Sequence, residues 1–242
     1  DMFTMCVPSK KMCVSLDNYV ACKTDDIYKY ESIDDVRSAL NIEYGTEIDF
    51  EFLSKEEGYQ IRHGYLPMNK KKVICGQSGI TIATGFDIGQ NNRKDLESYH
   101  FSSDLEGKLM PFVGAKKEDA RKMLPLAKKT ILTKKEANEI DFKAKGRHIK
   151  AAVNSWNKSR LENTPMFNEL TPAQQTVLLS RTFHQGLGMP KTRVAQKFYQ
   201  AALKNDWISA ENNLRNYNVK EQWYKDRVSN EANLLKNERL KK

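Results

Sequence analysis

FLSKEEG at residues 52–58 and GITIATGFDIG at residues 79–89 are the two stretches that decide the fold. The first is typical of the end of a helix, and a glycine-rich region follows it. In the second, the alternation of Ile80 and Ile82 with polar residues, followed by Gly85, predicts a short hairpin or strand pair. We therefore expect a helix that leads into a small β-structure.

The rest of the chain, from about residue 115, is predicted to be helical. Thr133 and Glu136 form a capping box before a long helix, because the two side chains can bond each other's unpaired backbone amides. Thr171 followed by Pro172 marks a second start, since proline at the first helical position loses no hydrogen bond. Further helices are predicted at 192–203, 207–214 and 226–235.

The N-terminal part differs from the remainder in composition. Residues 1–47 are predicted to be a cysteine-bearing leader with one short helix, capped near Ser32 and Asp34. Residues 48–242 are predicted to be the main domain, a small lobe with the hairpin followed by a larger helical lobe. The expected fold class is therefore α+β and mainly helical.

Composition limits the possible functions. The 242 residues are 39% hydrophobic, which is enough for a core, and no apolar run reaches the length of a membrane span. The net charge of +9 favours an anionic partner such as a bacterial envelope. We do not expect nucleic acid to be that partner, because the basic residues are dispersed and aromatic residues do not interleave with them.

The four cysteines leave two readings open. Cys6, Cys13, Cys22 and Cys75 could form up to two disulfides in an oxidising compartment, or remain buried thiols. No Cys-x-x-Cys spacing or neighbouring histidine predicts a zinc site. A thiol peptidase or amidase built on Cys75 would need a histidine partner, and no motif provides one.

One pair of carboxylates stands out. Cleaving a glycosidic bond generally needs a carboxylic acid to protonate the leaving oxygen and a carboxylate that acts as base or nucleophile. Residues 58–86 contain no acidic residue, although 31 of the 242 residues are Asp or Glu. A second carboxylate near the hairpin must therefore be Asp87 or come from outside this segment. Asp87 lies between glycines and apolar residues, and Glu57 directly precedes the segment without acidic residues.

The same residues also have ordinary structural explanations. Glu57 could be a helix-end carboxylate, and Asp87 could be a turn residue that bonds its own backbone. Thr81 and Thr84 could be present because threonine packs well in strands. Spacing alone does not decide between these explanations and catalysis.

The quoted stretches resemble the active site of phage-type lysozymes, in which a helix ends in Glu-Gly and the next hairpin carries Thr-Ile-Gly-x-Gly. On that match Glu57 takes the place of the general acid and Thr81 that of the hairpin threonine. Residues 132–137 are similar to a helix start in these lysozymes, and residues 180–186 are similar to their cleft-facing Phe-Gln-x-Gly segment. The resemblance covers about residues 48–242 and implies a two-lobed, lysozyme-like fold.

One departure separates the chain from most phage lysozymes. They carry the second carboxylate between the acid and the hairpin threonine, where this chain has none. An aspartate six residues after the threonine, as at Asp87, instead resembles the Glu, Thr, Asp order of pesticin, a bacteriocin with a lysozyme-like domain. The resemblance implies a muramidase that cuts peptidoglycan between N-acetylmuramic acid and N-acetylglucosamine.

In the implied mechanism, Glu57 is the general acid, and Asp87 activates a water that Thr81 holds. A water-using pair predicts inversion, with the carboxyl groups roughly 6.5–9.5 Å apart. The resemblance implies no metal and no organic cofactor. The residues expected to contact substrate are Thr84, His184, Gln185 and Arg227, of which Arg227 could also pair with Glu57 or be an ordinary surface arginine.

The resemblance to pesticin also implies a biological setting. We expect a monomeric antibacterial toxin that is secreted or delivered to the periplasm and cell wall of target bacteria, without stable insertion in a membrane. The producing cell would then carry an immunity protein that blocks the active site. The alternative is a lysozyme-like module that binds the cell wall and has lost catalysis.

Overall fold

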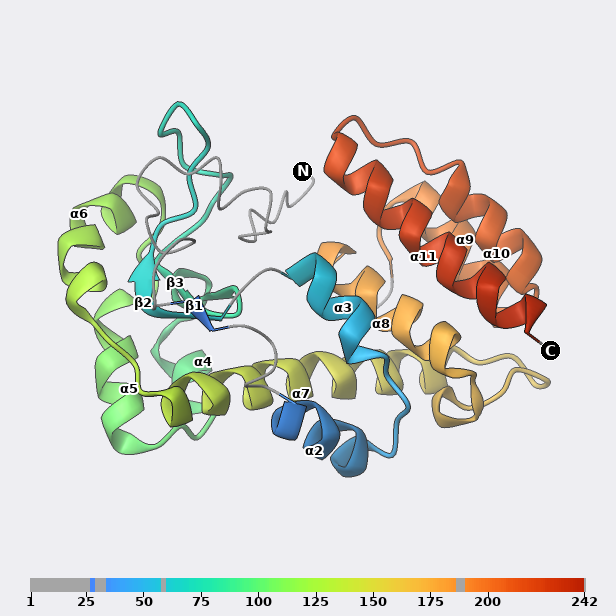
Figure 1. Cartoon of the computed structure of the whole chain (residues 1–242), viewed down its shortest axis with the longest axis horizontal. Coiled ribbons are helices and arrows are strands. Elements are labelled where there is room, and N and C mark those ends of the chain that lie inside the picture. The colour runs from blue at the N-terminus through green and yellow to red at the C-terminus, as the bar shows by residue number, and fades with distance from the viewer. Residues whose placement is uncertain (1–26, 29–33, 58–59, 186–189, 242) are drawn as a thin grey trace. The chain divides into compact units, whose positions relative to one another are not determined.

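The computed structural model describes residues 27–28, 34–57, 60–185 and 190–241 (Figure 1). The chain divides into two compact units, Asp1–Leu40 with Ser54–Gly146, and Asn41–Leu53 with Arg147–Lys242. The first unit contains the sheet, and the described part of the second is helical. The fold is thus α+β and mainly helical, as the sequence predicts. The predicted boundary at residue 47 stays a prediction.

The sheet is small and antiparallel. Its strand order is β1-β2-β3-β4, so each strand pairs with its neighbour in sequence. The register pairs Ile61 with Ala83 and Thr81 with Asp87. The strands are β1 (Ile27–Tyr28), β2 (Gln60–Tyr65), β3 (Thr81–Ala83) and β4 (Phe86–Asp87).

Helices pack around the sheet in the first unit, and Figure 1 shows α6 beside β2, which it contacts. The buried core includes Ile61, Ile80, Leu105 and Phe112, each at most 1% exposed. The helices of this unit are α4 (Arg93–Glu97), α5 (Ser103–Leu109), α6 (Lys117–Lys129), the first part of α7 (Lys134–Ser159), residues 34–40 of α2 (Asp34–Tyr44) and residues 54–57 of α3 (Phe50–Glu57), with short 3-10 turns at Ile88–Gln90 and Met110–Phe112. The strands β3 and β4 are therefore backed by a hydrophobic core, to which Ile82 and Phe86 belong.

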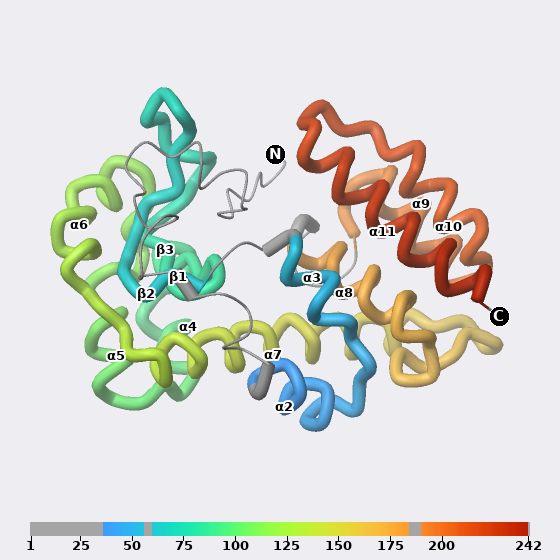
Figure 2. The backbone as a smooth tube through the Cα atoms, viewed as in Figure 1, coloured from blue at the N-terminus to red at the C-terminus, as the bar shows by residue number. Residues whose placement is uncertain are grey.

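The second unit is a set of packed helices. In Figure 2, α9, α10 and α11 lie together, and α10 contacts both of the others. Trp156, Phe167 and Phe198 are buried there, each at most 1% exposed. Its helices are α8 (Pro172–Gln185), α9 (Arg193–Leu203), α10 (Trp207–Arg215), α11 (Gln222–Leu240), the end of α7, and parts of α2 (Asp34–Tyr44) and α3 (Phe50–Glu57); Phe167–Glu169 form a 3-10 turn.

The capping box predicted at Thr133 is present, and the predicted helix start at Thr171 has one as well. Glu136 N donates to Thr133 Oγ1 at 3.1 Å, and Thr133 N donates to the Glu136 carboxylate at 2.7 Å. Thr171 N and Gln174 exchange the equivalent pair of bonds at the start of α8. Each box satisfies two backbone donors that the helix leaves unpaired, so α7 and α8 begin where the sequence predicts.

The second unit is built from two distant pieces of chain. Glu47 N donates to Gln175 Oε1 at 2.7 Å, and Asp49 N donates to Thr176 Oγ1 at 2.8 Å. The start of α3 is thereby fixed to α8, whose Gln175 and Thr176 are fully buried. Within the described residues, no helix is both long enough and apolar enough to cross a membrane.

Candidate active site

The hairpin brings Thr81 and Asp87 together. They are direct partners across β3 and β4, so their side chains leave the same face of the sheet. The turn between the strands is tight, with φ of +54° at Ala83 and +82° at Gly85. The left-handed conformation suits Gly85 because glycine has no Cβ. The tight turn at Gly85 sets the register of the hairpin, which pairs Thr81 with Asp87.

The Asp87 carboxylate is half-buried and held by backbone and side-chain donors. Gly79 N lies 3.2 Å from Oδ1 and 3.1 Å from Oδ2, and Gln90 Nε2 donates to Oδ2 at 3.1 Å. Burial raises the pKa of Asp87, although these hydrogen bonds act to lower it. A carboxylate with a raised pKa is a stronger proton acceptor, which is what a general base requires.

Two glycines let the backbone close around Asp87. A Cβ added at Gly79 would lie 2.6 Å from the Cα of Gly89 and 2.5 Å from the carbonyl oxygen of Ala115. A Cβ at Gly89 would meet the same carbonyl and would lie 2.8 Å from the Cα of Gly79. Because every one of these neighbours is backbone, only glycine fits at either position.

Thr81 is buried beside the aspartate, with 3% of its surface exposed. Its hydroxyl donates to the carbonyl oxygen of Gly79 at 3.1 Å. A hydroxyl has one proton and two lone pairs, so Thr81 Oγ1 is left as an acceptor. A water next to Asp87 could therefore donate one hydrogen to Thr81 and the other to the carboxylate.

Thr84, expected to contact substrate, is engaged inside the protein. Its hydroxyl donates to Asp141 Oδ2 at 2.8 Å, and its backbone N donates to Asp141 Oδ1 at 3.1 Å. Our sequence reasoning missed Asp141. The signal was available, because Asp141 follows Ala137 by four residues and Ile140 by one on the buried face of α7.

Three predicted site residues cannot be placed by their side chains. Glu57 is the last residue of α3, while His184 and Gln185 end α8. Their side chains lie outside what the structure describes, so their roles stay predictions.

Arg227 is buried, in contrast to the surface arginine that was the alternative reading. It is 4% exposed, and its Nη2 bonds Ser180 Oγ at 3.0 Å. Its Nε lies 3.6 Å from Glu231, which also pairs with Arg181 at 2.7 Å. Two arginines thus share one buried glutamate, and the predicted pairing of Arg227 with Glu57 stays a prediction.

Cys75 is disulfide-bonded, so it offers no thiolate nucleophile. The other cysteines, Cys6, Cys13 and Cys22, lie outside the described residues, and the pairing is therefore not assigned. Among the residues that the structure describes, no group of three or more His, Cys, Asp or Glu side chains is arranged to hold a metal ion.

A mainly helical α+β fold, with a hairpin that pairs a threonine and a half-buried aspartate, is consistent with the class of lysozyme-like proteins. A family model described as "Pesticin: Bacterial toxin homologue of phage lysozyme, C-term" matches residues 47–208, which is more than half of the chain. The chain therefore belongs to the pesticin family of lysozyme-like bacterial toxin domains. No curated protein matches it significantly.

Family membership bears on the site and on the function. The match includes Glu57, Thr81 and Asp87, whereas Arg227 lies C-terminal to it. Membership supports a muramidase-like toxin domain of the glycoside hydrolase type, directed at the bacterial cell wall.

Proposed function

We propose that the protein is a muramidase that hydrolyses the β-1,4 bond between N-acetylmuramic acid and N-acetylglucosamine in peptidoglycan. The observation that carries the proposal is the direct pairing of Thr81 with Asp87, whose burial raises the pKa of its carboxyl group. This pair follows Glu57 in the order acid, threonine, aspartate, and the whole segment falls within the pesticin family match.

In the proposed reaction, Glu57 donates its proton to the leaving glycosidic oxygen. A water held by Thr81 attacks the anomeric carbon and gives its proton to Asp87, so one C–O bond forms as the other breaks. Thr81 suits this role because its own proton already bonds Gly79, which leaves lone pairs for the water. Attack by water in one step inverts the anomeric configuration and needs carboxyl groups roughly 6.5–9.5 Å apart.

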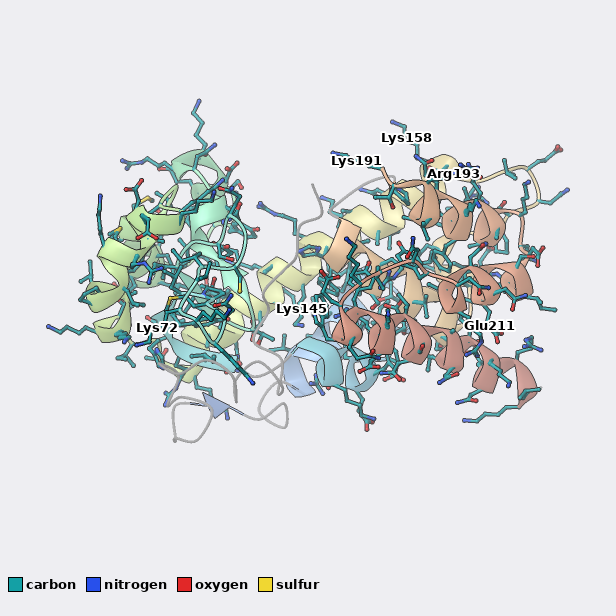
Figure 3. All side chains as sticks on the ribbon, turned by 90° about the horizontal axis from the view of Figure 1, so that it is seen from above. Lys72, Lys145, Lys158, Lys191, Arg193 and Glu211 are labelled. Atoms are coloured by element: carbon teal, nitrogen blue, oxygen red, sulfur yellow. The ribbon has the colours of Figure 1, made fainter. Side chains whose placement is uncertain are left out.

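The basic surface supports an envelope target. The chain has a net charge of +9, and Figure 3 shows Lys158, Lys191 and Arg193 projecting from the same edge of the second unit. All three side chains are exposed. They would attract the anionic wall of the target, and added salt would weaken this attraction as the Debye length falls to ~8 Å at physiological strength.

We also propose a biological setting, which membership of a toxin family supports. The protein acts as a monomer in the periplasm and cell wall of rival bacteria, and the producing cell protects itself with an immunity protein. Inhibition of peptidoglycan release by a protein encoded beside the toxin would test the last point.

The decisive experiment compares purified wild-type protein with Glu57→Gln and Asp87→Asn on isolated peptidoglycan. Glu56→Gln and the exposed Asp104→Asn are the matched controls, because each makes the same chemical change outside the proposed pair. Circular dichroism first establishes that every variant is folded. Mass spectrometry then identifies the released fragments, and NMR assigns the anomeric configuration of the new reducing end.

We expect wild type and both controls to release muropeptides with a new muramic reducing end, and the two site variants to release at least 100-fold less (roughly 10²–10⁴-fold). Fragments cut in the peptide, or release that survives Glu57→Gln, would overturn the proposal. Wall binding by wild type without any release would instead identify a non-catalytic binding module.

A further inference from the structure

A buried carboxylate outside the proposed catalytic pair lies behind the hairpin. Asp141, on α7, is 3% exposed. Burial raises the pKa of its carboxyl group, while Lys145 one turn further along α7 (labelled in Figure 3) and the hydrogen bonds from Gln60 and Thr84 favour the ionised form. Buried carboxylates are rare unless they are paired, so the contacts of Asp141 call for an explanation.

Asp141 accepts hydrogen bonds from two segments of chain. Thr84 contributes its backbone N at 3.1 Å and its hydroxyl at 2.8 Å. Gln60 contributes its side-chain Nε2 at 2.7 Å, and the same Nε2 also bonds Asn138 Oδ1 at 3.0 Å. Only a carboxylate presents two acceptor oxygens and no competing donor, so it can satisfy all of these groups at once.

Both segments adjoin the proposed catalytic residues. Thr84 lies in the turn between β3, which carries Thr81, and β4, which carries Asp87. Gln60 is the first residue of β2 and follows Glu57 by three residues. The side chain of Asp141 therefore binds both the turn between β3 and β4 and the start of β2.

We propose that Asp141 is a positioning residue for glycan cleavage, which fixes the β3–β4 turn and the start of β2 to helix α7. The inference rests on the proposed function. It also reassigns Thr84, whose hydroxyl serves the hairpin through Asp141 and does not serve the substrate. The class of substrate is unchanged, and what Asp141 controls is the placing of the turn between Thr81 and Asp87 and of the start of β2.

The effect should appear in kcat and not in KM. Asp141→Asn replaces one acceptor oxygen with an NH2 group, which then faces either the Thr84 amide or the Gln60 and Thr84 side-chain donors. In the first case two donors face each other. In the second case the Thr84 hydroxyl and the Gln60 amide must turn round to accept, and Gln60 then loses its bond to Asn138 Oδ1. Either change loosens the attachment of the turn, and a displacement of about 1 Å costs up to roughly 10²-fold in rate. Wall binding elsewhere on the protein does not depend on this turn, so KM is expected to stay within about twofold.

The structure offers a closely matched control on the same helix. Glu139 also accepts a backbone N–H and a hydroxyl from one residue, Ser102, at 2.7 Å and 3.0 Å. That residue precedes α5 and lies outside the hairpin. Glu139→Gln therefore makes the same chemical change to the same kind of contact, without touching the segments that carry the proposed catalytic residues.

The experiment measures kcat and KM for peptidoglycan hydrolysis with folded wild type, Asp141→Asn, Glu139→Gln and Thr84→Val. Hydrogen exchange of the Thr84 amide is measured in parallel, except in the Thr84 variant. We expect at least a tenfold loss of kcat in Asp141→Asn, with faster exchange at Thr84, and wild-type values in Glu139→Gln. Thr84→Val should lower kcat less than Asp141→Asn does, and should leave KM unchanged.

Wild-type kcat in folded Asp141→Asn would overturn the inference, as would a raised KM with unchanged kcat in Thr84→Val. If Asp141→Asn does not fold, the Thr84→Val arm decides alone, because it removes one hydroxyl and leaves the carboxylate in place. An inactive wild type would overturn the proposed function itself. In that case unchanged exchange at Thr84 in Asp141→Asn would separately refute the anchoring of the turn.

Discussion

Replacing Gly89 with alanine would place a methyl group against backbone on two sides. The new Cβ would lie 2.8 Å from the Cα of Gly79 and against the carbonyl oxygen of Ala115, and 3.2 Å from Asp87 Oδ1. Overpacking of this kind costs about 1–3 kcal/mol, and we expect the upper end because no flexible side chain can move aside. The strand that carries Asp87 would have to shift.

Gly107→Ala is the matched control. Gly107 lies within α5, and a Cβ added there meets nothing within 4 Å. The same substitution should stabilise this position by about 0.5–1 kcal/mol, because alanine is the better helix former. The free energies of unfolding of the Gly89 and Gly107 variants should thus differ by roughly 3–4 kcal/mol.

Urea unfolding of wild type and both variants measures the difference. With m of about 1–3 kcal/mol/M, the two midpoints should differ by about 1 M or more, with wild type between them. The Gly89 variant should also lose activity, since Asp87 lies two residues away. A Gly89→Ala variant as stable as wild type would refute the close packing around the aspartate.

Three further predictions concern the charges and the disulfide. Arg181→Met should lower the free energy of unfolding by about 3–5 kcal/mol, because it leaves Glu231 buried with one partner fewer. Arg93→Met removes one member of an exposed pair and should leave the free energy of unfolding close to that of wild type, so equal effects of the two variants in urea unfolding would contradict the buried cluster. The acid limb of the pH dependence of kcat/KM should lie above pH 3.8, the ordinary pKa of an aspartate, because burial raises the pKa of Asp87 and only its ionised form accepts a proton. A limb at or below pH 3.8 would count against Asp87 as the base. Cys75→Ser should lower the free energy of unfolding by about 2–5 kcal/mol, because it removes a disulfide. A reductant should likewise lower the urea midpoint of wild-type unfolding, and an unchanged midpoint would argue against a structural disulfide.

The helices that carry local signals were predictable. The capping box at Thr133 and Pro172 at the start of α8 are sequence-local, and both helices begin there. The strand β2 was not predicted, because its buried and partly buried residues come in pairs along QIRHGY and do not alternate one by one. The pattern of period two that is typical of a strand is therefore absent. The five-residue helix α4 was also missed, although Asn92 and Asp95 form a capping box that could have marked it.

The site was predictable only for residues that belong to a recognisable local sequence motif. Thr81 and Asp87 could be singled out from their motif, and the hairpin pairs them. Their supports could not be predicted, because the Gly79 amide reaches Asp87 only after the chain folds back, and Asp141 reaches Thr84 across 57 positions. Such contacts depend on tertiary packing, which spacing in the sequence does not encode.

The attachment of α3 to α8 affects when the second unit can fold during synthesis. The amide of Asp49 leaves the ribosome 127 residues before its partner Thr176. At about 5–20 residues per second, that interval lasts roughly 6–25 s. Throughout it, Phe50 and Leu53, both buried in the finished protein, lack the partner helix against which α3 is fixed. The second unit therefore cannot be completed until most of the chain has been made, and a ribosome that stalls before α8 leaves this apolar segment open to other hydrophobic surfaces.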